Sequence, residues 1–202
     1  MLNRLLDTLH GRSVFPRRVE VLTAALADLM PEGARVLDVG AGDGTIGQRI
    51  MQRRPDVHFE GVDVMVRPHT AYPVRAFDGD HLPFDDNSHD VALFVDVLHH
   101  TRDPAALLRE AARVAPVVIL KDHLREGLLA EETLTFMDWV GNARHGVVLP
   151  YNYLNRLQWR AAIAQAGLVV DEWGEQVGLY PWPASSVFDR QLHVIARLHR
   201  GP

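Results

Sequence analysis

The spacing of apolar residues along the chain changes several times between a helical period and short continuous runs. A helical period begins after Pro16, and it follows a stretch at 2–10 that is itself typical of a short helix stopped by Gly11. The turn at 31–33 ends this period. From there to about residue 123, short apolar runs alternate with helical segments, which predicts alternating strands and helices.

Five strands are predicted in this region, at 34–39, 57–64, 74–77, 90–97 and 115–122. The run at 90–97 is nearly continuous in apolar residues, as expected for a strand that is buried on both faces. A helix is predicted at 45–54, and another begins at Asp103, an N-cap aspartate followed by proline. Two later runs, 168–177 and 190–198, are joined by a long aromatic loop and predict a closing antiparallel hairpin.

This alternation predicts an α/β fold with helices on both faces of a mostly parallel sheet. We expect one Rossmann-like, doubly wound domain: a mostly parallel seven-stranded sheet with a terminal antiparallel hairpin and a helical lid insertion. The expected parts are N-terminal helices at 1–32, a cofactor-binding core at 33–123, a helical lid or substrate region at 124–166 and a closing hairpin at 167–202. A chain of 202 residues is long enough for one domain with a full core.

Composition narrows the classes of function. The net charge of −5 argues against a general nucleic-acid binder, and the basic pairs at 17–18 and 53–54 are expected on solvated helix faces. Neither a membrane-length apolar run nor a signal-peptide pattern is present, so a cytoplasmic protein without a membrane span is expected. With no cysteine, disulfides and thiolate metal sites are excluded. The expected partner is a small-molecule acceptor, and a homodimer is left open.

The stretch VLDVGAGDGTIG, at 36–47, places four glycines and two aspartates behind the first predicted strand. Glycine allows a ligand to approach the backbone, and ligands of open parallel sheets bind beyond the carboxyl ends of the strands. A Walker-type phosphate loop is excluded because Thr45 and Ile46, instead of Lys and Ser or Thr, follow the last glycine of the turn.

The dinucleotide fingerprint is harder to exclude. Its spacing is matched by Gly42, Gly44 and Gly47, and Asp63 follows at the distance of a ribose-binding acid. Counted from the end of the strand, however, its third position falls on Thr45. The carboxylates of Asp38 and Asp43 would also repel a pyrophosphate, whereas they would attract a cation. Asp43 is equally suited to capping the helix that follows.

Four stretches resemble, in order and at normal spacing, the motifs of the class I S-adenosylmethionine-dependent methyltransferases, close to the "type 11" small-molecule branch. They are VLDVGAGDG, FEGVDV, FDGDHLPFDDNSHDVALFVDV and VLHHTRDP, and the resemblance covers about 35–122. It implies a Rossmann-like fold, methyl-transfer activity and S-adenosylmethionine as cofactor. This cofactor carries a sulfonium and an ammonium group but no phosphate, in agreement with the aspartates beside the turn.

The resemblance also implies how the cofactor is held. Asp38 would lie near its amino-acid end, directly or through water, and Asp63 would accept both ribose hydroxyls. Asp78 would meet the adenine amine, with Asp80 as the alternative, and Gly79 would leave room for the ring. The expected cofactor-binding residues are Asp38, Gly40, Ala41, Gly42, Asp63, Val64, Asp78, Gly79 and Asp96.

Methyl transfer is an in-line displacement, so holding nucleophile and methyl group in line supplies much of the catalysis. An oxygen or nitrogen acceptor can also require a base. The candidates at the carboxyl ends of the fourth and fifth predicted strands are His99, His100, Asp122 and His123, and loop capping is the alternative role for each. No metal site is expected from these histidines, because no spacing such as HExxH is present.

The segment 124–182 holds all four tryptophans, and its aromatic residues could line an acceptor pocket or simply form core under a lid. The fourth strand ends in VDVLHH, without the motif of enzymes that methylate nucleic-acid amines. We therefore predict methyl transfer to an unidentified small, partly apolar or aromatic acceptor, with His-assisted deprotonation as an option. The alternatives are an NAD-dependent oxidoreductase that uses the same glycine turn, and a non-catalytic, cofactor-binding partner protein with the methyltransferase fold.

Overall fold

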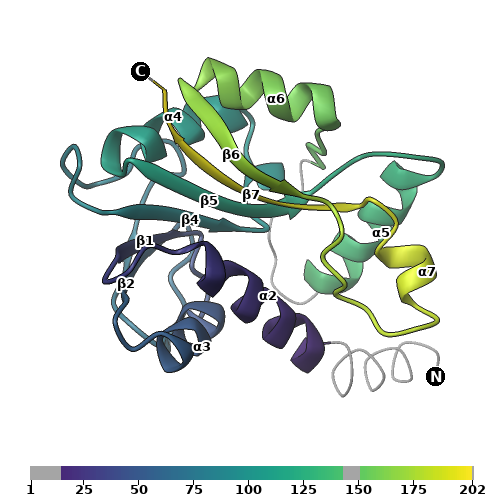
Figure 1. Cartoon of the computed structure of the whole chain (residues 1–202), viewed down its shortest axis with the longest axis horizontal. Coiled ribbons are helices and arrows are strands. Elements are labelled where there is room, and N and C mark those ends of the chain that lie inside the picture. Colours follow the sequence, from purple (N-terminus) through teal and green to yellow (C-terminus); the bar gives the residue numbers. More distant parts are fainter. Residues whose placement is uncertain (1–14, 143–150, 202) are drawn as a thin grey trace.

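The computed structural model describes residues 15–142 and 151–201, so the helix predicted at 2–10 lies outside the described residues. Its centre is a seven-stranded sheet in the order β3-β2-β1-β4-β5-β7-β6 (Figure 1). The strands are β1 (Arg35–Val39), β2 (His58–Asp63), β3 (Val74–Ala76), β4 (Val91–Val95), β5 (Val117–His123), β6 (Leu168–Gly174) and β7 (His193–Arg200). The first five pair in parallel, and β7 lies antiparallel between β5 and β6. The predicted fold is confirmed.

Helices cover both faces of the sheet. They are α2 (Phe15–Leu29), α3 (Thr45–Arg53), α4 (Pro104–Val114), α5 (Ala130–Asn142), α6 (Arg156–Gln165) and α7 (Ser185–Phe188), with a 3-10 turn, η2, at Leu98–His100. Figure 1 shows α2 and α3 below the sheet, α4 and α6 above it, and α5 and α7 at one end. That end holds the carboxyl ends of the parallel strands, because β5 runs into the connection to α5.

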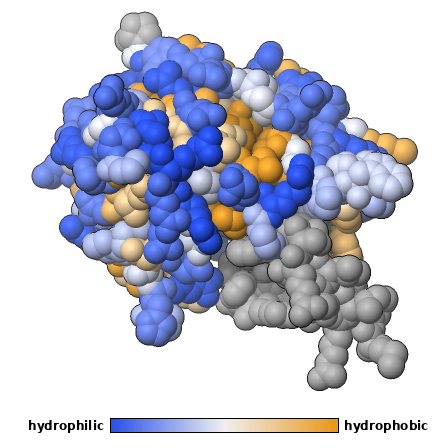
Figure 2. All heavy atoms as spheres, turned by 60° about the horizontal axis from the view of Figure 1, so that its bottom comes forward, coloured by the Kyte–Doolittle hydropathy of each residue, from blue (hydrophilic) through white to orange (hydrophobic). Residues whose placement is uncertain are grey.

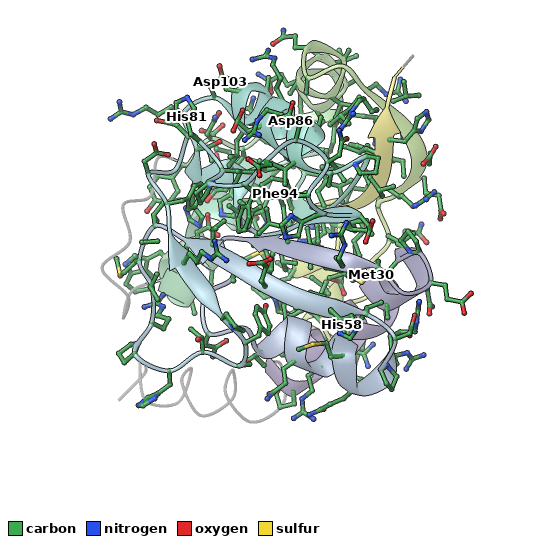
Figure 3. The ribbon with its side chains drawn as sticks, turned by 90° about the vertical axis from the view of Figure 1, so that its left-hand side faces the viewer. Met30, His58, His81, Asp86, Phe94 and Asp103 are labelled. Carbon is green, nitrogen blue, oxygen red and sulfur yellow. The ribbon has the colours of Figure 1, made fainter. Side chains whose placement is uncertain are left out.

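The pleat of the strands divides the core into two layers. In β4, Val91 and Leu93 pack toward α2 and α3, whereas Ala92 and Phe94 pack toward α4. Phe94 lies in the interior of the molecule, between the sheet and the helices (Figure 3). The face that comes forward in Figure 2 is mostly hydrophilic, with apolar surface gathered near its centre. Since β4 packs against helices on both faces, the prediction that this strand is buried on both faces is confirmed.

Local signals in the sequence explain where α4 begins. The side chain of Asp103 accepts a hydrogen bond from the Ala106 N–H at 3.0 Å, and Pro104 occupies the first turn of the helix. The predicted N-cap is therefore confirmed. A second cap, at Asn155, was not predicted: its side chain and that of Gln158 form a reciprocal capping box that starts α6.

The segment expected as a lid divides into two parts with different surroundings. Trp159 and Ile163 of α6 are buried in the same core cluster as the apolar face of α4. They are four residues apart and so share one face of the helix. Since α6 is a layer helix of the domain, α5 is the described helix of the expected lid that stands at the carboxyl end of the strands (Figure 1).

Arg54 is not on a solvated helix face, contrary to the prediction from the basic pair. Its guanidinium donates to the carbonyls of Ala27, Met30 and Pro31 at 3.0, 3.2 and 3.1 Å, and it pairs with Asp56. The C-terminal carbonyls of α2 lack partners within the helix, and this side chain supplies donors for them. It therefore joins the end of α3 to the end of α2.

Gly47 fixes how closely α3 approaches the sheet. A Cβ at this position would lie 2.5 Å from the Tyr72 hydroxyl and 2.7 Å from Cδ1 of Phe59 in β2. No real Cβ makes such contacts, so the helix can lie this near to β2 only with glycine here. Close packing of helix on strand is also the role of the third glycine in the dinucleotide fingerprint.

Replacing Gly47 with alanine should destabilise the fold although alanine favours helices by about 1 kcal/mol. Overpacking costs about 1–3 kcal/mol, so we expect the urea midpoint to fall with an unchanged denaturant slope. The exposed neighbour Gln48→Ala is the matched control and should stay within about 0.5 kcal/mol of wild type. A Gly47→Ala protein as stable as wild type would show that the contact at Phe59 does not restrict the helix.

Candidate active site

The turn after β1 lies where the sheet order reverses between β1 and β4. Gly40, Gly42 and Gly44 all have left-handed backbone, with φ of 78°, 59° and 78°. A Cβ on Gly40 would lie 2.5 Å from Cγ2 of Val97, in the loop after β4, so the two loops can touch only with glycine here. Beside Gly42, by contrast, a Cβ would meet nothing within 4 Å. The turn therefore presents open backbone at the crevice.

Asp63, at the end of β2, faces this turn. Its Oδ2 accepts a hydrogen bond from the Gly42 N–H at 2.8 Å, and its Oδ1 accepts one from the Met65 N–H, also at 2.8 Å. The side chain is half-buried. The structure thus brings together the glycine turn and the acid that the sequence placed about twenty residues apart.

Val64 and Gly79 border a space beside Asp63. The Val64 side chain is 64% exposed, and its Cγ1 would lie 3.4 Å from a Cβ built on Gly79. Gly79 has a φ of 93°, a conformation that side-chain-bearing residues rarely adopt. An apolar side chain and a bare backbone therefore lie next to each other at the border of the place where the adenine ring is expected.

Asp78 stands beside this space and shapes its own loop. Its Oδ1 accepts hydrogen bonds from the backbone N–H groups of Asp80 and His81 at 2.8 and 2.7 Å, and these bonds lower the pKa of Asp78. The loop lies between β3 and β4, with His81 at the periphery of the molecule (Figure 3). The Oδ2 oxygen makes a long 3.5 Å contact with His81, so it is the oxygen that can accept from a ligand.

Asp38 is buried behind the glycine turn, on the α2 and α3 side of β1. Its Oδ2 accepts the Tyr72 hydroxyl proton at 2.5 Å, and only 5% of the residue is exposed. Burial raises its pKa to about 6, although the bond from Tyr72 works against this rise. The structure therefore separates Asp38 from the open backbone of Gly42 and gives it an internal partner that the sequence did not suggest.

Asp43 lies one residue before Gly44, which is the N-cap position of α3 and has no side chain to cap the helix, and Asp43 contributes a hydrogen bond there instead. Its Oδ1 accepts from the N–H of Thr45, the first residue of α3, at 2.9 Å. This carboxylate therefore satisfies a free donor at the N-terminus of the helix.

Asp96, expected to bind cofactor, has cationic partners within the protein. Its carboxylate pairs with Arg18 of α2 and with the fully buried Lys121 of β5. Burial alone would raise its pKa, but these two cations hold the pKa well below its usual range. Arg18 thus belongs to a partly buried ion pair and not to the solvated face predicted for it. With both oxygens engaged, Asp96 anchors α2 to the ends of β4 and β5.

Asp122, at the end of β5, organises the turn that carries two of the predicted histidines. Its Oδ1 accepts from Nδ1 of His99 and from the N–H of His123, both at 2.6 Å, and its Oδ2 accepts from the Leu98 N–H at 2.8 Å. Asp122 is fully buried and His99 is 2% exposed. Burial opposes the charged imidazole, but Asp122 and Asp138 outweigh it and raise the pKa of His99 to about 10.

Asp138 of α5 joins the cluster from the other side, and it was not among the residues predicted for the site. Its Oδ1 lies 3.1 Å from Nε2 of His123, and its Oδ2 accepts from the Tyr153 hydroxyl at 2.6 Å and lies 3.3 Å from Nε2 of His99. Burial disfavours its charge, but the two histidines lower its pKa. Burial also lowers the pKa of His123.

His100 differs from its two neighbours because it is only half-buried. Its ring lies 4.0 Å from that of His99, centroid to centroid. Burial and the neighbouring His99 lower its pKa to about 4. Its Nδ1 is buried without a hydrogen-bond partner among the described residues. The four predicted catalytic residues therefore lie in one cluster at the carboxyl ends of β4 and β5.

The residues near the glycine turn fit the cofactor that the resemblance implies. Open backbone at Gly42, a half-buried carboxylate at Asp63 and the apolar border of Val64 and Gly79 suit a ribose with a flat base. Asp78 adds a carboxylate oxygen at the edge of the same space. Asp38 adds a carboxylate deeper in the site, which suits a cationic ligand better than a pyrophosphate.

Comparison with known proteins agrees with this geometry. A family model described as a methyltransferase domain matches residues 11–172. The 27-O-demethylrifamycin SV methyltransferase of Amycolatopsis mediterranei (strain S699) is 32% identical over 108 residues, which cover 46% of this chain and 39% of that protein. The chain thus spans about two-fifths of that relative's length.

Solved structures share the fold at low sequence identity. The methyltransferase bound to the Trm112 activator of Haloferax volcanii superposes with a TM-score of 0.67 at 19% identity, covering 99% of this chain and 94% of that one. An S-adenosylmethionine-dependent methyltransferase from Mesorhizobium loti gives a TM-score of 0.64 at 18% identity, covering 88% and 96%.

None of the described helices combines the length and the apolar character needed to cross a membrane.

The family match extends over most of the chain, and the sheet order, the glycine turn and the acid after β2 are those expected from the resemblance. The chain belongs to the class I methyltransferases, the family whose methyl donor is S-adenosylmethionine.

Proposed function

We propose that this protein transfers the methyl group of S-adenosylmethionine to a small, partly apolar or aromatic acceptor. The observation that carries the proposal is the position of two groups at one end of the sheet. The glycine turn with Asp63 lies after β1 and β2, and the histidine cluster lies after β4 and β5. A donor and an acceptor held at these two places would meet at the point where the strand order reverses.

On the donor side, each residue has a defined part in the proposal. Asp63 accepts the ribose hydroxyls, Asp78 accepts the adenine amine through Oδ2, and Val64 packs against the ring above Gly79. Asp38 contributes its charge from behind the turn toward the amino-acid end. The cofactor, when bound, supplies a methyl group activated by a sulfonium, and the protein's task is to hold it in line with the acceptor.

On the acceptor side, His100 is the candidate base. Among His99, His100 and His123 it is the one with substantial exposure, so an acceptor that enters from solvent meets it first. His99 and Asp122 hold the turn on which it stands. The two buried histidines therefore position the turn, and His100 takes the proton from an oxygen or nitrogen acceptor.

An aromatic pocket supports the acceptor class. It has a volume of about 510 Å³ and is lined by Glu131, Glu132, Thr135, Phe136, Trp139 and Tyr151. It is open to solvent, since Phe136, Trp139 and Tyr151 are 45%, 53% and 39% exposed. The Tyr151 ring lies 6.1 Å from that of Tyr153, whose hydroxyl bonds to Asp138 in the histidine cluster. The pocket is thus connected to the cluster by two neighbouring tyrosines whose rings are tilted by 49°, and its two glutamates disfavour an anionic ring.

The assignment of Asp78 over Asp80 can be tested by calorimetry with S-adenosylmethionine and its demethylated product. In Asp78→Asn, the amide oxygen can keep the two turn hydrogen bonds while an NH₂ group replaces Oδ2 and faces the adenine amine. We expect about tenfold weaker binding or more, and unchanged binding in Asp80→Asn. Equal losses would remove the assignment, and a wild-type protein that binds neither compound would refute the proposed function.

We expect the charge of Asp38 to lower the stability of the fold while it strengthens cofactor binding. Its folded-state pKa of about 6 exceeds the usual value of 3.8, so the folded state holds the proton more tightly and wild-type stability falls as pH rises between these values. Asp38→Asn keeps an acceptor for Tyr72 without the buried charge. Urea unfolding should therefore show the variant more stable by about 1–3 kcal/mol at pH 8, with a smaller gain at pH 5 and weaker S-adenosylmethionine binding. A gain that does not change with pH would show that Asp38 bears no ionised charge.

The role of His100 can be tested with deuterium-methyl S-adenosylmethionine and a panel of phenols, catechols, indoles and aromatic amines, followed by mass spectrometry. We expect at least one compound to gain the labelled methyl group, and His100→Ala to lose about 10²–10⁴ in turnover at unchanged cofactor affinity. The exposed His81→Ala is the control. Full turnover in His100→Ala would eliminate the base, and a panel without any product would eliminate the aromatic acceptor class.

A further inference from the structure

Three side chains with metal-binding atoms meet inside the histidine cluster. His99 comes from η2, His123 from the end of β5 and Asp138 from α5. One ligand atom from each lies within 4.8 Å of the others. All three residues are more than nine-tenths buried. Two imidazoles and one carboxylate from three separate elements thus face one small space.

The distances within this group match a shared ligand centre. The Asp138 carboxylate lies between the two rings, with Oδ2 at 3.3 Å from Nε2 of His99 and Oδ1 at 3.1 Å from Nε2 of His123. Atoms that bind one metal at about 2.0–2.2 Å are about this far from one another. The Nε2 of His99 is buried and makes no hydrogen bond within the described part of the chain. Its nearest polar neighbour is Oδ2 of Asp138 at 3.3 Å, so this nitrogen points at the carboxylate of the group.

The surrounding hydrogen bonds orient two of these side chains, His99 and Asp138, as a metal site requires, whereas Nδ1 of His123 has no hydrogen-bond partner among the described residues. Asp122 accepts from Nδ1 of His99 at 2.6 Å, which leaves the lone pair of a neutral ring on Nε2. The Tyr153 hydroxyl donates to Asp138 at 2.6 Å and thereby supports the ionised carboxylate. A carboxylate behind a histidine is the usual second contact of metal-binding imidazoles.

Charge also favours a cation at this place. Asp122 and Asp138 bring two buried carboxylates, and the rings of His99 and His123 lie only 4.5 Å apart, centroid to centroid. One divalent ion between two neutral rings would balance both carboxylates.

We propose that His99, His123 and Asp138 bind one divalent first-row transition metal in a two-histidine, one-carboxylate site. This ligand set is found with Zn²⁺ and with non-haem Fe²⁺, and it leaves coordination positions open. The absence of an HExxH-type spacing does not bear on this site, because its ligands come from three elements that only the fold brings together. As a consequence that rests on the proposed function, the open positions would hold an oxygen atom of the acceptor beside His100.

The test uses the purified full-length chain after removal of metal with a chelator. Zn²⁺, Co²⁺, Mn²⁺ and, without oxygen, Fe²⁺ are titrated separately by calorimetry, and elemental analysis gives the stoichiometry. We expect one tightly bound ion per chain, a higher melting temperature with metal, and visible absorption from bound Co²⁺. Binding of S-adenosylmethionine is measured on the same samples, so failure of the metal site and failure of the proposed function can be told apart.

Variants locate the ion. Asp138→Asn retains an oxygen for Tyr153 and should weaken metal binding about a hundredfold, and Asp122→Asn should weaken it about 10–100-fold through loss of the contact behind His99. The matched control is His193→Gln, which alters a buried histidine whose ring lies 5.6 Å from that of His123, outside the ligand group. Retained circular dichroism and cofactor binding report that each variant is folded.

Two results would overturn the proposal. One is a folded wild-type protein that binds none of the four ions in a 1:1 ratio, which would leave the cluster as a network of hydrogen bonds alone. The other is binding that is equally strong in Asp138→Asn and His99→Gln, which would place the ion at exposed histidines elsewhere on the surface.

Discussion

The carboxylate of Asp122 holds the acceptor end of the molecule together. It accepts three hydrogen bonds within 2.8 Å, from two backbone N–H groups and one imidazole, while it is fully buried. A buried carboxylate without such donors would cost several kcal/mol, so the loop after β4 must stay where its Leu98 N–H and His99 ring satisfy this charge. The position of η2, and with it that of His100, follows from this one requirement.

A second buried charged side chain, that of Lys121, fixes the position of α2. Lys121 neighbours Asp122 on β5 but points to the other face of the sheet, where it meets Asp96 and Arg18. Asp96 has a left-handed backbone, with φ of 56°, which costs energy for a residue with a side chain. The two cations fix the carboxylate and so maintain this conformation. Adjacent residues of β5 therefore anchor α2 on one face and the histidine turn on the other.

The donor half of the site could be predicted from the sequence because its residues follow the ends of strands directly. Gly40, Gly42 and Asp63 come immediately after apolar runs, so the sheet alone brings them together. The acceptor half depends on contacts between distant segments. Asp138 lies on a helix with no distinguishing spacing, and its partners are 15 and 39 residues away in the sequence.

The positions of charged residues were the hardest to predict from the sequence, because the same residue types occur on solvated faces and in ion pairs inside the protein. Arg18 and Arg54 each belong to a pair of arginines, a pattern that favours an exposed helix face. In the structure, Arg18 pairs with Asp96, and Arg54 donates hydrogen bonds to carbonyls at the end of α2. Asp38 and Asp96 stand in sequence positions where ligand-binding acids are expected. In the structure, Asp38 accepts a hydrogen bond from Tyr72, and Asp96 pairs with Lys121. Only the packing of the elements decides which charges meet, and sequence spacing does not contain that information.

The insertion of β7 between β5 and β6 has a consequence for how the protein is made. β7 pairs with β5 along seven residue pairs, from Val117 to His123, yet it is synthesised after all other strands. Until then one edge of β5 is an unpaired row of backbone groups over an apolar strand, which is an aggregation hazard for a nascent chain. The strands that carry the glycine turn and Asp63 are complete much earlier. The growing polypeptide therefore acquires its donor half first, and a cofactor bound there could stabilise the unfinished sheet before its last strand arrives.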